Sequence, residues 1–73
     1  MKLYQISFKQ FNKISKIINN LYNEKIISLN EKIKLTRLFE LMLYGDIKNA
    51  NILLVGYDQY LSYQAEKIVE KLN

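Results

Sequence analysis

The first clear pattern in the chain is an alternation of apolar and polar side chains over residues 2–9. The apolar positions are Tyr4, Ile6 and Phe8, and the polar positions between and after them are Gln5, Ser7 and Lys9. A period of two is typical of a β-strand with one buried and one exposed face. No other segment is as clear a partner, and the N–H and C=O groups of a strand beside a core must be paired. The pattern therefore predicts antiparallel pairing with the same strand of a second copy, with Ile6 and Phe8 facing inward.

Helical spacing follows this segment and predicts a first helix over about residues 10–24, with apolar residues at i, i+3, i+4 and i+7. These apolar residues are Phe11, Ile14, Ile17, Ile18, Leu21 and Tyr22. The opposite face holds mainly Lys13, Lys16, Asn19, Asn20 and Asn23. We interpret it as an ordinary solvated face, on which the two lysines could also touch phosphates.

A second helix is predicted from Ser28 to about Tyr44, after a short link at Lys25-Ile26-Ile27. Ser28-Leu29-Asn30-Glu31 has the S-x-x-E pattern of a capping box, in which each side chain accepts the backbone N–H of the other residue. Gly45 can supply the left-handed residue at the end of the helix. The apolar surface of this helix is too broad for one short neighbour, which again favours a partner chain.

The last third of the chain predicts further helical structure. Asp46 can cap a third helix, although Asn51 to Val55 could instead form a short strand. Gly56-Tyr57-Asp58 can break or kink the helix, and another amphipathic stretch follows from Gln59. Whether residues 46–72 form one helix or two stays open at this point.

The size and composition of the chain also favour association. Seventy-three residues make one small domain, which buries a marginal amount of surface alone. The chain has no cysteine and no histidine, so neither a disulfide nor a Cys-based metal site is possible. A glycine-rich phosphate loop is absent too, so we expect neither an enzyme nor a cofactor or metal. Dimerisation is the expected source of the missing buried surface.

Charge is distributed unevenly along the chain. Residues 1–37 hold eight basic and two acidic residues, a net charge of +6. Residues 38–73 hold three basic and five acidic residues, a net charge of −2. This concentration favours a polyanionic partner, nucleic acid before membrane, although lysines that only keep the protein soluble would give the same composition. The short apolar runs cannot span a membrane, and no apolar signal-peptide block is present, so we expect a cytoplasmic protein.

The order strand, helix, short link and capped helix resembles the ribbon-helix-helix family of DNA-binding dimers, which includes the Arc and methionine repressors. Gln5-Ile6-Ser7-Phe8-Lys9 is similar to the ribbon of that family, and Phe8 precedes Ser28 by the family's spacing of twenty residues. The resemblance covers residues 2–45 and departs from the family at Ile26-Ile27, where glycine is common, and at Lys9, where arginine is usual. Length and composition also resemble small ribbon-helix-helix proteins of spindle-shaped viruses that infect Sulfolobus.

This resemblance implies a mainly α fold with one short N-terminal β-strand. Two copies would form an intermolecular antiparallel ribbon, and residues 46–73 would be a C-terminal helical extension of the core at residues 1–45, within one domain. The residues implied for the dimer core are Ile6, Phe8, Ile14, Ile18, Leu21, Ile33, Leu38 and Leu41. Those implied for base contacts are Gln5, Ser7 and Lys9, and those for phosphate contacts are Ser28, Asn30, Lys25 and Lys32. The simpler interpretations are a solvated edge strand and a plain helix cap.

The function expected from the resemblance is that of a homodimer that binds duplex DNA in a sequence-specific manner as a transcriptional regulator. The ribbon would enter the major groove, and the start of the second helix would face a phosphate. One alternative is a small all-helical interaction factor or inhibitor, in which residues 2–9 begin the first helix. Another is a ribbon-helix-helix antitoxin, in which residues 46–73 wrap a toxin or another protein partner.

Overall fold

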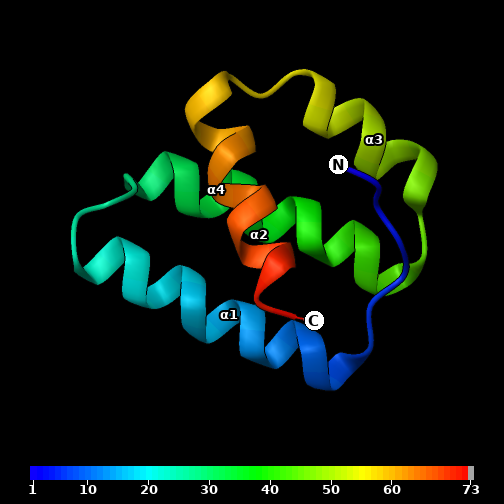
Figure 1. Ribbon diagram of the computed structural model, residues 1–73, viewed down its shortest axis with the longest axis horizontal. Coiled ribbons are helices and arrows are strands. Elements are labelled where there is room, and N and C mark those ends of the chain that lie inside the picture. Colours follow the sequence, from blue (N-terminus) through cyan, green and yellow to red (C-terminus); the bar gives the residue numbers. More distant parts are fainter. Residues whose placement is uncertain (73) are drawn as a thin grey trace.

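The computed structural model describes residues 1–72, which form four helices preceded by an extended N-terminal segment (Figure 1). The helices are α1 (Phe8–Asn23), α2 (Leu29–Tyr44), α3 (Ile47–Val55) and α4 (Gln59–Glu70). Helix α2 lies at the centre, and each of the other three helices packs against it. Within residues 1–72, no helix combines the length and the apolar character needed to cross a lipid bilayer.

Each helix begins at a side chain that accepts a backbone N–H of the first turn. These capping residues are Ser7, Ser28, Asp46 and Asp58. The capping box at Ser28 is confirmed, with both of its hydrogen bonds to Glu31 formed. The cap at Asp46 is confirmed as well, and Gly45 has the expected left-handed backbone at φ 79°. Local side-chain chemistry therefore fixes where the helices start and where α2 ends.

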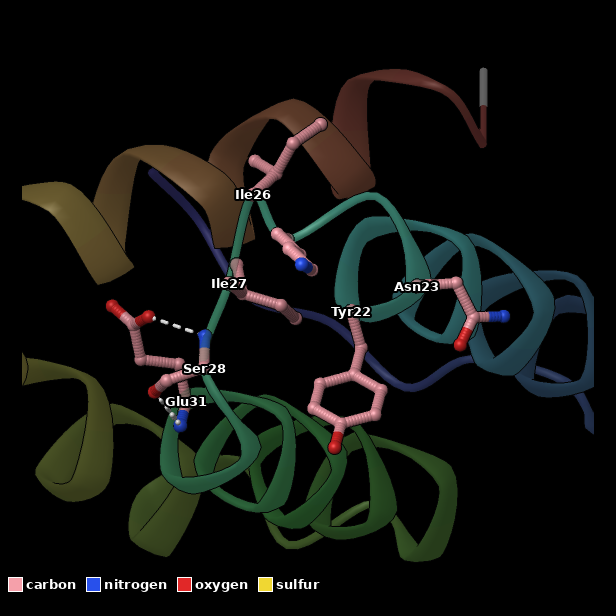
Figure 2. A pocket seen from close by; sticks show the side chains of 7 residues that line it. Tyr22, Asn23, Ile26, Ile27, Ser28 and Glu31 are labelled. Atoms are coloured by element: carbon pink, nitrogen blue, oxygen red, sulfur yellow. Dashed lines mark hydrogen bonds between the residues drawn. The ribbon is translucent and has the colours of Figure 1, made fainter.

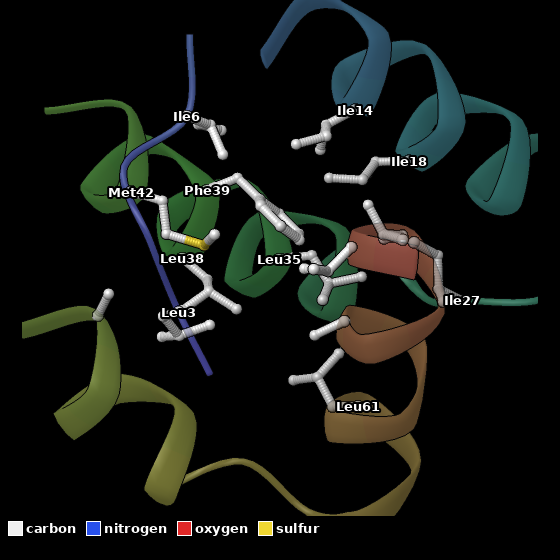
Figure 3. Packing of buried hydrophobic residues seen from close by; sticks show 14 residues of the cluster. Leu3, Ile6, Ile14, Ile18, Ile27, Leu35, Leu38, Phe39, Met42 and Leu61 are labelled. Carbon is white, nitrogen blue, oxygen red and sulfur yellow. The ribbon is translucent and has the colours of Figure 1, made fainter. Parts of the chain in front are cut away.

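One apolar core holds the fold together (Figure 3). The fully buried side chains of α2 are Leu35, Leu38, Phe39 and Met42. The remaining members are Leu3, Ile6, Ile14, Ile18, Ile27, Ala50, Leu61, Ala65, Ile68 and Val69. The core thus draws on every helix and on the N-terminal segment, so residues 1–72 pack as a single unit.

The predicted N-terminal β-strand and its intermolecular ribbon are wrong, because residues 1–72 contain no strand. Residues 1–7 are extended but lie on their own chain, where Leu3 and Ile6 enter the core. The N–H of Ile6 donates to the carbonyl of Met42 at 3.2 Å, so a carbonyl of α2 takes the place of the expected partner strand. Phe8 begins α1 and is 68% exposed. The prediction that Phe8 faces inward is therefore wrong as well.

The broad apolar surface of α2, which favoured a partner chain, is covered within the same chain. Ala50 of α3 and Leu61, Ala65 and Ile68 of α4 share its core. Residues 46–72 are thus two helices, with Gly56 at the break, and Asn51 to Val55 is helical rather than a strand. The architecture of residues 1–45 is therefore not that of a ribbon-helix-helix protein.

The residues expected in a dimer core divide into two groups. Buried or half-buried in the single chain are Ile6, Ile14, Ile18, Leu21, Leu38 and Leu41. Phe8 and Ile33 are exposed, and Ile33 keeps 52% of its accessible surface. The packing of these eight residues against a second copy stays a prediction.

Candidate functional site

The three residues expected to contact bases are all exposed, and two of them hydrogen-bond within the chain. The amide of Gln5 donates to the carbonyl of Leu43 at 3.4 Å, at the end of α2. The hydroxyl of Ser7 accepts the N–H of Gln10 at 3.1 Å, and the Ser7 N–H donates to the Gln10 side chain at 2.8 Å. Lys9 alone projects freely from the first turn of α1. The polar groups of Gln5 and Ser7 therefore serve the fold, and the Lys9 ammonium group is the one of the three without a hydrogen bond within residues 1–72.

The expected phosphate site lies at a hollow of about 640 Å³ between the end of α1 and the start of α2 (Figure 2). The Ser28 N–H donates to the Glu31 carboxylate at 2.8 Å, and the Glu31 N–H donates to the Ser28 hydroxyl at 3.1 Å. A carboxylate at a helix N-terminus already supplies the negative charge that the helix dipole favours. A phosphate at this position would meet the Glu31 carboxylate, which makes the hollow poorly suited to an anion.

The other residues expected at this phosphate site are spread around the link between the two helices. Lys32 places its ammonium group 4.9 Å from the centre of the Tyr22 ring, a cation–π contact that joins α2 to α1. Lys25 has a left-handed backbone at φ 62° and shapes the link itself. Asn30 is exposed in the first turn of α2. Lys25 and Lys32 thus have structural tasks, and of the four residues expected to contact phosphate only Lys25 and Ser28 line the hollow.

The outer face of α1 carries a different and more uniform constellation. Seven exposed positions form one stripe at helical spacing, and we call them the α1 stripe. They are Lys9, Asn12, Lys13, Lys16, Asn19, Asn20 and Asn23. Every member is lysine or asparagine, and Phe8–Asn23 contains no acidic residue. Sequence analysis identified most of this face but treated it as ordinary solvated surface. The absence of any carboxylate over the whole helix is the signal that it missed.

The α1 stripe lies along an open edge of the molecule. In Figure 1, α1 runs along the lower border, and no element packs against its outer side. From Lys9 to Asn23 the stripe spans about 21 Å at 1.5 Å per residue. The lysines occupy its N-terminal half and the asparagines dominate its C-terminal half, so the stripe has a cationic end and a neutral amide end.

The end of α4 adjoins the cationic half of the stripe. The ammonium group of Lys13 donates to the carbonyl of Lys71 at 3.2 Å, which brings the exposed Lys71 close to α1. The nearby Glu70 carboxylate lies 3.9 Å from the ammonium group of Lys67, with both side chains about half exposed. Within residues 1–72 this is the one ion pair, so no lysine of the stripe is paired with a carboxylate.

This arrangement suits binding to an anionic, hydrogen-bonding polymer. Lysine ammonium groups are donors with full charge, and an asparagine amide offers a donor and an acceptor side by side. Residues 1–72 contain no group of three or more acidic side chains that could hold a metal ion. The chemistry that the surface offers is recognition of charge and of hydrogen-bonding edges.

Comparisons of the chain with known protein families, with curated proteins and with solved structures found no match.

Proposed function

We propose that the protein binds duplex DNA through the α1 stripe. The observation that carries the proposal is that seven of the nine exposed positions of α1 are lysine or asparagine, without a carboxylate on the helix; the other two are Phe8 and Tyr22. An α-helix fits into the major groove of B-DNA, which is about 12 Å wide. In this arrangement α1 is the element that enters the groove, in place of the expected ribbon.

The lysine end of the stripe provides most of the affinity. Lys9, Lys13 and Lys16 are exposed and lie within two turns of helix, so they can reach phosphates along one strand. Each phosphate that a lysine neutralises releases condensed counterions, which makes binding weaken as salt rises. The net charge of +6 over residues 1–37 adds long-range attraction to the same partner.

The asparagine end of the stripe provides base discrimination. An asparagine amide can donate to N7 of adenine while its oxygen accepts from the N6 amino group in the same plane, the pairing that selects adenine in the major groove. Asn19, Asn20 and Asn23 are exposed on the same side as the lysines. Binding that depends on sequence is what a transcriptional regulator requires, and we include that role in the proposal.

The first test is the salt dependence of binding to a labelled mixture of short duplexes, followed by fluorescence anisotropy at 50 and 200 mM salt. We expect the triple variant Lys9→Gln, Lys13→Gln, Lys16→Gln to reduce the slope of log affinity against log salt by about 2–3, at about 0.9 per phosphate. The matched control is Lys2→Gln, Lys34→Gln, Lys48→Gln, which removes the same charge from exposed sites away from α1. Equal losses in both variants would show that only net charge matters and would contradict the proposal.

The second part of the test concerns the asparagines. Duplexes selected from a random pool by the wild type should show a base preference that Asn19→Ala, Asn20→Ala, Asn23→Ala abolishes. The salt slope of that variant should stay the same, because no charge changes. Alanine is the better helix former, so the variant should fold at least as well as the wild type. An unchanged base preference would exclude α1 as the recognition element.

A further inference from the structure

A second hollow, of about 340 Å³, lies between α2 and α3 and is independent of the α1 stripe. We call it the α2–α3 groove. It is lined by Ile33, Lys34, Arg37, Ile52, Leu53, Gly56 and Tyr57. In the view of Figure 1, α3 and α1 lie on opposite sides of the central helix. The groove and the stripe could therefore be occupied at the same time.

Large apolar side chains border the groove and stay exposed. Ile33 on α2 and Ile52 on α3 keep 52% and 61% of their accessible surface. Leu29, one turn before Ile33, is 55% exposed, and Val55, one turn after Ile52, is 85% exposed. Ile33 and Ile52 line the groove, and Leu29 and Val55 lie one helical turn from them on the same two helices.

Folding of the single chain does not explain why large apolar side chains stand at these exposed positions. Ile33, Ile52 and Val55 are β-branched, and in a helix such side chains lose rotamer freedom against the preceding turn. At exposed positions that loss is not offset by burial, and a polar helix former would serve the helix better. An apolar surface of this kind, in a groove with charged residues at its border, is typical of a site for a protein partner.

The charged residues of the groove are all basic. Lys34 and Arg37 lie one turn apart on α2, and no acidic side chain belongs to the lining. Glu40 lies one turn beyond Arg37, but within residues 1–72 the two make no ion pair. The carboxylate of Asp58 accepts the N–H of Leu61 at 2.8 Å and caps α4. The guanidinium of Arg37 is thus available for a carboxylate from outside.

Tyr57 lines one side of the groove and is held in place by a hydrogen bond. Its hydroxyl donates to the carbonyl of Lys34 and so joins the turn between α3 and α4 to α2. Burial raises the pKa of Tyr57 to about 12, partly offset by the charge of Arg37. The hydroxyl therefore stays protonated and keeps donating at any physiological pH, and the groove is formed before a partner arrives.

We propose that the α2–α3 groove binds an acidic amphipathic helix of another protein. Apolar side chains at i, i+3 and i+4 of that helix would cover Ile33 and Ile52, and its carboxylates would face Lys34 and Arg37. A second copy of this chain fits less well, because a two-fold axis through the groove would place the basic residues of both copies together. The partner is thus defined by its chemistry as an apolar helix face with acidic flanks.

The test uses a displayed library of random 16-residue helical peptides with apolar residues at i, i+3, i+4 and i+7. Peptides selected on the wild-type chain should be acidic at the flanking positions. Their affinity should fall at least tenfold for Arg37→Glu and for Ile52→Asn. The matched control is Tyr44→Asn, which changes a side chain that is 75% exposed outside the groove and should leave affinity unchanged.

Two outcomes would overturn the proposal. One is a failed selection, in which the selected peptides show no acidic bias or bind Arg37→Glu and Ile52→Asn as tightly as they bind the wild type. The other is self-association of the wild type in sedimentation velocity that Ile52→Asn abolishes, which would make a second copy the occupant. Neither outcome depends on DNA binding, because the lysines and asparagines of α1 are unchanged in every variant.

Discussion

At the scale of single residues, Lys25 is the one non-glycine residue among residues 1–72 with a positive φ, 62°. It closes α1, where the Ile26 N–H donates to the Leu21 carbonyl at 2.9 Å and the Lys25 N–H to the Tyr22 carbonyl at 3.0 Å. This pair of bonds is the Schellman arrangement that glycine normally completes. A side chain in this conformation brings its Cβ too close to a carbonyl oxygen.

We expect Lys25→Gly to raise the free energy of unfolding by about 0.5–1 kcal/mol, because relief of the left-handed strain exceeds the entropy that glycine loses on folding. Urea denaturation followed by circular dichroism measures the change. Lys25→Ala is the matched control, since it removes the charge but keeps the Cβ. A gain in the control as large as that of the glycine variant would assign the effect to charge instead.

At the scale of elements, the start of α1 matters most, because it ends the extended N-terminal segment within the predicted strand of residues 2–9. Ser7 and Gln10 form a capping box with the same two bonds as Ser28 and Glu31. The box turns the chain from an extended segment into a helix at Phe8. It also fixes the direction in which Lys9 and the rest of the α1 stripe project.

We expect Ser7→Ala to lower the free energy of unfolding by about 1 kcal/mol, because the Gln10 N–H loses its acceptor. Ser15→Ala, in the middle of α1, should change it little or raise it slightly, because alanine is the better helix former. Thermal or urea denaturation of both variants makes the comparison. Equal effects of the two substitutions would mean that Ser7 does not cap the helix in solution.

The same elements show what the sequence could and could not predict. The second helix, its capping box, Gly45 and Asp46 were predicted correctly because their signals are local. Ser7-Phe8-Lys9-Gln10 has the equivalent S-x-x-Q pattern, which went unrecognised because the alternation of Tyr4, Ile6 and Phe8 was interpreted as a strand. What decides against the strand is distant, since the N–H of Ile6 finds its acceptor at Met42.

The α1 stripe and the α2–α3 groove also differ in how far the sequence could predict them. The lysines and asparagines of α1 were visible at helical spacing, but their value depends on α1 lying at an open edge of the fold. The α2–α3 groove could not be predicted, because Ile33 and Ile52 meet only once α3 has turned back along α2. Local patterns predict helices, whereas grooves depend on how helices are placed against each other.

At the scale of the whole molecule, the core does not divide at residue 45. Leu35, Leu38 and Met42 are fully buried, and α3 and α4 supply the core from the other side with side chains such as Leu61 and Ile68. A chain of this size has little stability to lose. Residues 1–45 and 46–72 therefore depend on each other.

We expect a chain that ends at Gly45 to be unfolded, with weak helical circular dichroism and no cooperative transition in urea. The full chain with Leu61→Ala is the milder comparison, which should fold but lose about 2–4 kcal/mol of the free energy of unfolding. A cooperative transition for residues 1–45 alone would show that this part is an independent domain after all.

The contact between the N-terminal segment and the end of α2 has a consequence for synthesis on the ribosome. Leu3 and Ile6 emerge before α2, yet Ile6 bonds to Met42, thirty-six positions later. Helix α1 contains its own cap and can begin to form while these two apolar side chains are still uncovered. Leu3 and Ile6 thus reach their final positions only after the later α2 has been translated, and a nascent chain stays open until α2 is complete.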